Sequence, residues 1–389
     1  MSFTFWIFIY VLAVFCLTYS LDIRRKKQFF LVLVLPVLIY VHTFVDVNTV
    51  ADLPAYNKSF HDVASVNVFN PIDIHRYLRL HKEEYGFICM LKIVRFITDD
   101  FHVFLCLNSC ILLGLYSYSI LKYSDDAYIS VLLLLLVVFD QSLFVLRQHL
   151  SISILWLSIP YIINRKIVPF VVILSIAFLF HKSSLIWFVV YFMYGAEKSW
   201  KIIGILGCAT IVMSLIFSNL SYLNETFSLG YASYIDGRRM GTSNYVGFFL
   251  GLFFLLSYCY ICWKNLWENS IVKLCFISLF IWTLMSFVGI NILILSRFTL
   301  VFRSSLFFAV PIIFYSIKSQ NLRFLYLGIS LVLFAYSNYF GSFSDYVKNT
   351  ELFMVNPMQM CYFFLLVLGT IYLLFHYTQE EGVQLQEKY

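Results

Sequence analysis

Residues 127–143 read AYISVLLLLLVVFDQSL, a long apolar run in which Asp140 is the only charged side chain. This stretch decides the fold class. A membrane-spanning helix needs about 20 mostly apolar residues, with a range of roughly 17–25. The composition of the 389-residue chain agrees, since 61% of its residues are apolar and 12% are charged. In soluble domains about 45–50% of the residues are apolar and about 25% are charged. We therefore predict an all-α, polytopic membrane bundle that forms a single domain over residues 1–389, and the composition argues against a nucleic-acid partner or a disulfide scaffold.

Apolar runs of similar length recur along the whole chain. The stretch 85–98 carries Lys92 and Arg95 and is predicted to be an interfacial helix rather than a crossing. Two other runs are short and flank residues 181–184 (HKSS), so they form either a pair of short helices or one long broken helix. We predict about 13 transmembrane helices, at residues 3–20, 28–46, 101–121, 127–143, 148–163, 167–181, 184–195, 202–219, 245–263, 270–289, 299–317, 321–338 and 358–377.

Basic residues in the short loops set the expected orientation. The cluster at residues 24–27 (RRKK) belongs on the cytoplasmic side. That places the N-terminus outside, together with one long outer loop at residues 47–100 that contains the interfacial helix. The acidic tail at residues 378–389 then lies in the cytoplasm. If 167–195 were a single crossing, four later basic loops would lie outside, which favours two short helices there.

The outer and inner faces differ in the kind of basic residue that they carry. With this topology the inner face has ten Lys and four Arg, whereas the outer face has eight Arg and five Lys. Arginine presents a planar fork of donors that matches phosphate and carboxylate oxygens in pairs. An arginine-rich outer face therefore predicts a bound anion, although an arginine at a helix end can also simply extend to the lipid phosphates.

The chain has neither a Gly-rich nucleotide-binding loop nor a His/Cys cluster with metal-ligand spacing. We expect neither a metal nor a cofactor. Because sugar nucleotides are not available outside the cytoplasm, an outward-facing membrane enzyme with an arginine cluster is expected to use a donor linked to a lipid phosphate.

Short patterns on the predicted outer face resemble those of a known family. Asp52-Leu-Pro-Ala-Tyr56 is similar to its Asp-x-x-x-Tyr. Glu84-Tyr85-Gly86-Phe87 is similar to its Glu-Pro-Gly-Phe/Tyr, with Tyr85 in place of the usual proline, so the turn geometry there is an open question. The later matches are Arg147 followed by Leu150, Phe180-His181-Lys182-Ser183 for Phe-His-x-Ser, and Arg297 as a late outer-face arginine.

In this order and spacing the chain resembles the EpsG family of polytopic polymerases, which is allied in role to the Wzy-type polymerases. The resemblance implies polymerisation of undecaprenyl-diphosphate-linked oligosaccharide repeat units on the outer leaflet of a bacterial inner membrane. The product would be O-antigen, capsule or exopolysaccharide. The implied partners are the lipid-linked oligosaccharide substrate, the lipid bilayer, a chain-length regulator and a flippase.

Candidate roles follow for the residues of these patterns. Arg147 and Arg297 would stabilise the leaving diphosphate, and Arg238 and Arg239 would hold the diphosphate of the acceptor. The acceptor hydroxyl needs a general base, for which the candidates are Glu84, Asp52 and His181; Tyr56 is expected to contact the substrate. Two other classes of function share these parts: a flippase for lipid-linked glycans, and an outward-facing glycosyltransferase or ligase with a different acceptor.

Overall fold

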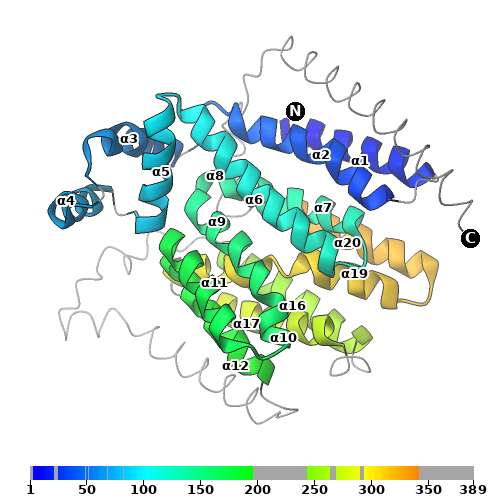
Figure 1. Cartoon of the computed structure of the whole chain (residues 1–389). Helices are drawn as coiled ribbons and strands as arrows, with labels where there is room; N and C mark the ends of the chain where they lie inside the picture. Colours follow the sequence, from blue (N-terminus) through cyan, green and yellow to red (C-terminus); the bar gives the residue numbers. More distant parts are fainter. Residues whose placement is uncertain are drawn as a thin grey trace, which may run out of the picture.

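The computed structural model describes residues 3–21, 25–48, 50, 52–67, 69–81, 83–195, 243–262, 269–289 and 293–340, and every described element is a helix (Figure 1). The predicted crossings 202–219 and 358–377 and the predicted tail 378–389 lie outside these residues. The bounds of most other elements follow the predicted crossings, because runs of apolar residues set them. The predicted crossing 299–317 differs, since a turn at residues 304–305 divides it between two helices.

Five described helices are long and apolar enough to cross a membrane, by length and composition. They are α2 (Lys26–Thr43), α6 (Phe101–Tyr123), the continuous segment Ala127–Phe144, α16 (Ser243–Cys262, with Tyr245–Cys262 as the apolar part) and α17 (Ser270–Gly289). Ala127–Phe144 consists of α7 (Ala127–Leu134), one turn of π-helix (η2, Leu135–Phe139) and α8 (Asp140–Phe144). These helices confirm the prediction of an all-α polytopic membrane protein, while the number 13 stays a prediction.

Shorter helices complete the described bundle. The predicted crossing 148–163 is broken into α9 (Leu146–Leu155), a 3-10 turn (η3, Trp156–Ser158) and α10 (Ile159–Ile163), where Pro160 stands at the start of the last piece. A proline inside a continuous helix would remove a hydrogen bond and clash with the preceding turn. The remaining helices of the bundle are α1 (Phe3–Ser20), α18 (Leu293–Arg303), α19 (Leu306–Ser316) and α20 (Gln320–Phe340).

Buried serines join the helices across an otherwise apolar core. Trp156 donates its indole N–H to Ser304 at 3.0 Å, and Trp187 donates to Ser158 at 2.9 Å. Both tryptophans are almost fully buried. Helices in a membrane gain little from apolar burial against each other, so close packing and hydrogen bonds between helices contribute more of their association.

Loops that the predicted topology puts on one side meet at one end of the bundle. Lys27 donates to the carbonyl of Asp125 at 2.9 Å, and Tyr315 donates to Asp126 at 2.5 Å. Arg323 donates to the carbonyl of Ile317 nearby along the chain. The turns between α1 and α2, α6 and α7, and α19 and α20 therefore share an end, as three predicted inner loops should.

The predicted pair of short crossings is a helical hairpin. α11 (Ile167–Phe180) ends at His181, whose backbone is extended, and the chain continues through η4 (Lys182–Trp187) into α12 (Phe188–Gly195). Arg165, just before α11, donates to the carbonyl of Tyr191 on α12 and lies 4.0 Å from the centroid of its ring. The start of α11 is thus beside the later part of α12, which agrees with two short antiparallel helices instead of one broken helix.

The segment predicted as the outer loop folds into three helices that gather at one end of the long helices (Figure 1). They are α3 (Leu53–Asp62, followed by the turn η1, Val63–Ser65), α4 (Pro71–His81) and α5 (Tyr85–Ile97). α5 is the predicted interfacial helix. It buries Phe87, Leu91 and Val94, and exposes Phe96 and other apolar side chains, with Phe96 91% exposed.

Gly86 allows α5 to pack closely against α11. A Cβ atom at this position would lie 2.8 Å from both the Cβ and the carbonyl oxygen of Leu179, near the end of α11. A glycine is therefore what permits the two backbones to approach so closely. This contact sets the position of Glu84, which precedes the first turn of α5.

Candidate active site

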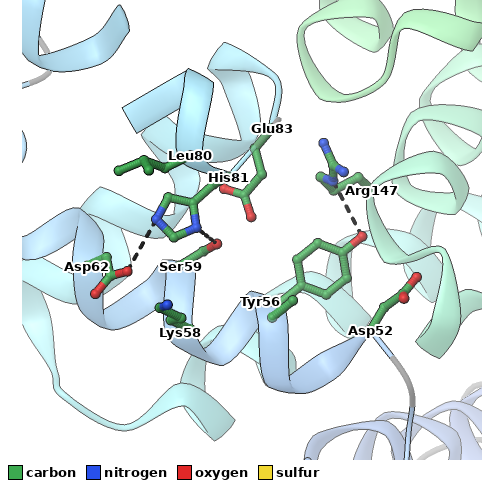
Figure 2. A pocket seen from close by; sticks show the side chains of 10 residues that line it. Asp52, Tyr56, Lys58, Ser59, Asp62, Leu80, His81, Glu83 and Arg147 are labelled. Atoms are coloured by element: carbon green, nitrogen blue, oxygen red, sulfur yellow. Dashed lines mark hydrogen bonds and ion pairs between the residues drawn. The ribbon is translucent and has the colours of Figure 1, made fainter. Parts of the chain in front are cut away.

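A cavity of about 440 Å³ opens where the three outer helices meet the start of α9 (Figure 2). Its walls are polar on most sides, which is unusual so close to apolar membrane helices. The lining residues are Asp52, Ala55, Tyr56, Lys58, Ser59, Asp62, Leu80, His81, Glu83 and Arg147.

Arg147 forms one wall of the cavity, and several groups fix its orientation. Its guanidinium makes an ion pair with Glu84 and donates from Nε to the Tyr56 hydroxyl at 3.4 Å. It also lies 5.6 Å and 5.8 Å from the ring centroids of Tyr56 and Phe87. The side chain is 18% exposed and that of Glu84 is 10% exposed. A positive charge with this much burial and this many partners is pre-organised to receive an anion.

The backbone places Arg147 at the cavity because the chain breaks just before it. Val145 departs from helical geometry between α8 and α9 (φ −115°, ψ 54°), so Arg147 lies in the first turn of a new helix. Leu150, one turn later, is fully buried and anchors that turn in the core. Burial raises the pKa of the Tyr56 phenol, while the charge of Arg147 opposes the rise, so the hydroxyl keeps its proton and can donate it to a ligand.

Glu84 joins two segments that are distant in the sequence, those of Arg147 and Lys182. One carboxylate oxygen pairs with Arg147, and the other accepts the backbone N–H of Lys182 at 3.4 Å. The Lys182 turn is itself held by His181, whose Nδ1 accepts the N–H of Ser183 at 3.2 Å and lies 2.7 Å from its hydroxyl. The pattern that begins at Glu84 and the pattern that contains His181 and Lys182 thus form one hydrogen-bonded unit behind the cavity wall, although Glu84 and Lys182 are 98 residues apart in the sequence.

The opposite wall holds a chain of polar groups from α3, α4 and the segment between α4 and α5 (Figure 2). His81 lies between the two α3 residues, with Nδ1 2.9 Å from the Ser59 hydroxyl and Nε2 3.2 Å from Asp62. Glu83 is 5% exposed and accepts from the Tyr77 hydroxyl at 3.4 Å. Burial raises the pKa of Glu83 to about 7, although Ser59, Arg147 and Tyr77 act to lower it.

Comparison with models of known protein families places the chain in one of them. The model of the EpsG family matches residues 29–356, which is most of the chain and includes every segment that lines the cavity. The chain belongs to the EpsG family. Comparisons with curated proteins and with solved structures give no match. Membership supports a polysaccharide polymerase, an enzyme of glycosyltransferase type, carried on an integral membrane protein.

The structure of this EpsG-family protein brings several predicted site residues together and separates others. Asp52, Tyr56 and Arg147 line the cavity, and Glu84 lies directly behind Arg147. His181 does not line the cavity but contacts it through the Lys182 turn. Arg297 lies on α18, with its side chain outside what the structure describes, and Arg238 and Arg239 lie outside the described residues.

Sequence reasoning missed Ser59, His81 and Glu83 as site residues. One signal was available: Ser59 and Asp62 are three residues apart on α3 and therefore share a helical face with Tyr56. No comparable signal separates Glu83 from Glu84, because two adjacent carboxylates differ only in the direction that the local backbone gives them.

A second group of polar residues lies deeper in the bundle of this EpsG-family protein. His149, on α9, is 1% exposed and interacts electrostatically with Arg303, His42 and His181. With its amide turned, Gln141 accepts from Arg303 at 3.2 Å. Arg303 ends α18, and although an arginine at a helix end can extend to the lipid phosphates, this one contacts the buried Gln141 instead.

Proposed function

We propose that this protein polymerises lipid-diphosphate-linked oligosaccharide repeat units on the outer leaflet of a bacterial inner membrane, producing O-antigen, capsule or exopolysaccharide. The observation that carries the proposal is the oriented Arg147 guanidinium on the wall of a polar cavity. The donor would be a growing glycan on undecaprenyl diphosphate, and the acceptor would be a single lipid-linked repeat unit. The outer location rests on the predicted topology.

Arg147 would stabilise the diphosphate as it leaves. Breaking the bond between the anomeric carbon and the diphosphate oxygen puts negative charge on the leaving group, so a fixed cation acts most strongly in the transition state. No general acid is needed when cations stabilise that charge. Arg297, Arg238 and Arg239 stay proposed as further diphosphate contacts, the last two for the acceptor.

The other predicted residues take distinct roles in this proposal. Tyr56 would donate a hydrogen bond to the substrate, and Asp52 would face the sugar from the mouth of the cavity. Glu84 is committed to Arg147 and the Lys182 N–H through both of its oxygens. We therefore assign Glu84 and His181 to positioning Arg147 instead of to proton transfer. The lipid-linked oligosaccharide, the bilayer, a flippase and a chain-length regulator are the proposed partners.

The test replaces Arg147 in a strain that lacks its native polymerase. Arg147→Ala should lower the rate of chain extension by about 10²–10³, by analogy with the loss of one oxyanion donor, and Arg147→Lys should recover only part of it because lysine lacks the planar fork. Arg76→Ala is the matched control, since Arg76 is exposed on α4. Long chains of normal amount from Arg147→Ala would contradict the assigned role.

A reaction with purified components separates polymerase from the alternatives. Wild-type protein in vesicles receives lipid-linked repeat units alone. A ladder of products on lipid supports the polymerase, and Arg147→Ala should not form one. Movement of the lipid-linked unit between leaflets without a ladder would favour a flippase. Transfer to a different acceptor without a ladder would favour a ligase.

A further inference from the structure

We propose that Glu83 is the general base of the transfer, and that Ser59, His81 and Asp62 carry the abstracted proton from it to solvent. The proposal rests on the polymerase function above and names the second wall of the same cavity as its proton-transfer machinery. It replaces the three bases predicted from the sequence, namely Glu84, Asp52 and His181.

Ser59, His81 and Asp62 form a hydrogen-bonded path, and Glu83 lines the same cavity beside its first member. Tyr77 joins Glu83 to this path, because its hydroxyl donates at 3.4 Å to the Glu83 carboxylate and at 2.9 Å to the Ser59 carbonyl. The Ser59 hydroxyl lies 2.9 Å from Nδ1 of His81. Nε2 of His81 lies 3.2 Å from Asp62. Glu83 and Ser59 are buried, at 5% and 2% exposed, whereas the side chain of Asp62 at the far end is 45% exposed. The path therefore runs from a buried carboxyl to a carboxylate in contact with water.

The directions of the hydrogen bonds suit outward proton transfer. Asp62 accepts from Nε2–H of His81, which leaves Nδ1 as an acceptor for the Ser59 hydroxyl. A turn of the protonated Glu83 carboxyl toward Ser59 would let the serine oxygen take the proton while the serine passes its own to Nδ1. The Tyr77 ring lies against the His81 ring, with 4.3 Å between centroids, and its hydroxyl donates to the Ser59 carbonyl at 2.9 Å. It thereby fixes both members of the relay.

The proposed step balances as follows. The acceptor hydroxyl gives its proton to the Glu83 carboxylate, and its oxygen forms a bond to the anomeric carbon of the donor. The bond from that carbon to the diphosphate oxygen breaks, and the diphosphate leaves with the electron pair beside Arg147. The proton then moves from Glu83 through Ser59 to His81, and the imidazolium, paired with Asp62, releases a proton to water.

The surroundings of Glu83 suit a base that works near neutral pH. Its pKa is raised to about 7 by burial, and a base is most effective when its pKa is near the working pH. Arg147 lies across the same cavity, so base and leaving-group cation line opposite walls. The titratable or charged groups around Glu83 are Asp52 just before α3, Tyr56, Lys58 and Asp62 from α3, Tyr77 and His81 from α4, Glu84 beside it, and Arg147 from α9.

The first test replaces Glu83 with glutamine, which keeps the shape and removes the base. Glu83→Gln should lower the rate of extension by about 10²–10⁴ while binding of the lipid-linked donor changes little. The wild-type rate should rise with pH up to about 7, and the residual rate of Glu83→Gln should lose that rise. Asp73→Asn, on α4, is the matched control. A normal rate and pH profile for Glu83→Gln would overturn the proposal.

The second test addresses the relay. His81→Gly should extend chains slowly, and added imidazole should restore part of the rate, because free imidazole can occupy the vacated space and accept the proton. A residue that only supported the fold would not be rescued in this way. His61→Gly, at an exposed position of α3, is the control for loss of a histidine. A slow His81→Gly that no concentration of imidazole accelerates would exclude the relay.

Failure of the base and failure of the function give different results. If Arg147→Ala abolishes the ladder but Glu83→Gln and His81→Gly do not, the polymerase stands and the base lies elsewhere. Asp52→Asn should then be the slow variant. If wild-type protein makes no ladder from lipid-linked repeats, the polymerase function itself is wrong.

Discussion

Arg147 and Glu84 show how one partly buried ion pair sets the geometry of the cavity. With 18% and 10% of their side chains exposed, both groups lose much of their hydration, and each therefore depends on the other. The interaction gains its value from orientation more than from net stability. Glu84 holds the guanidinium against Tyr56 and Phe87, where its remaining donors can face the cavity.

Removing one partner of this pair should be worse than removing both. Glu84→Gln or Arg147→Gln alone should lower stability by about 3–5 kcal/mol, because an unpaired charge stays buried. The double variant should lose less than either single variant, because it leaves no unpaired charge buried. The measurement is the apparent melting temperature of the four proteins in one detergent. Additive losses would show that the two side chains do not interact.

An exposed ion pair supplies the comparison. Arg95 pairs with Asp99 across one turn, and Asp99 is 80% exposed. Such surface pairs contribute about 0–1 kcal/mol, so Asp99→Asn should leave the melting temperature nearly unchanged.

Glu83 should oppose folding at neutral and alkaline pH. Its folded pKa of about 7 is above its ordinary value of 4.5, so the folded state binds the proton more tightly than the unfolded state does. The stabilising contribution of the protonated carboxyl is present below about pH 4.5 and is lost as the pH rises to about 7. Glu83→Gln should therefore be more stable than wild type at pH 8, by on the order of 1–3 kcal/mol, while it extends chains poorly.

A thermal shift series between pH 5 and pH 8.5 checks this prediction. The difference between Glu83→Gln and wild type should grow with pH and level off above about pH 7. A difference that shrinks with rising pH would mean that the carboxylate is stabilised in the folded protein.

At the scale of the element, the start of α5 combines two backbone requirements in neighbouring residues. Glu84 is extended (φ −89°, ψ 153°) and Tyr85 is the first residue of the helix. Proline is favoured at the first position of a helix, and it requires the residue before it to be extended. Tyr85 and Glu84 meet these two conditions. The question of turn geometry raised by Tyr85 is thus answered, because the turn has the shape that proline would impose.

Tyr85→Pro should accordingly be tolerated. Proline reduces the freedom of the unfolded chain, and at a compatible position it stabilises a protein by about 0.4–1 kcal/mol. The rate of chain extension should stay near that of wild type. Thermal shift and the polymerisation ladder measure the two effects, and a large loss in either would show that the Tyr85 side chain has a role of its own.

Gly86→Ala should have the opposite effect, although alanine normally favours a helix by about 1 kcal/mol. The added Cβ would meet Leu179 at 2.8 Å, including its backbone carbonyl, and overpacking costs about 1–3 kcal/mol. The clash should also displace Glu84 and slow extension. Gly114→Ala on α6 is the matched control, because a Cβ there meets nothing within 4 Å. Equal melting temperatures for the two variants would contradict the close approach.

At the scale of the whole molecule, the sequence predicted the helical membrane fold because long apolar runs determine it almost alone. It also predicted Asp52, Tyr56 and Glu84 from the long outer loop and Arg147 from an outer helix end as residues of one site, on the strength of the family resemblance. It did not predict Glu83, Ser59 and His81. Side chains alternate along an extended backbone, so the conformation between α4 and α5 decides which of two adjacent glutamates faces the cavity, and no residue pattern encodes that choice.

The two ends of the bundle give a test of orientation. In a variant whose nine cysteines are replaced by alanine, Lys182→Cys should react with an impermeant thiol reagent from outside. Lys122→Cys, at the end that holds Lys27 and Asp125, should react only after the membrane is opened. Labelling of both from the same side would refute the predicted topology.

The exposed apolar side chains of α5 bear on how the substrate is handled. Ile93, Phe96 and Ile97 are 62%, 91% and 76% exposed, as expected of a helix that rests on the surface of a bilayer. A helix in that position would hold the cavity level with the lipid headgroups. The polyprenyl tail could then remain dissolved in hydrocarbon through every round of extension. Withdrawing the tail into water would cost about 0.8 kcal/mol for each CH₂ group. A cavity at this depth keeps that cost out of every round of extension.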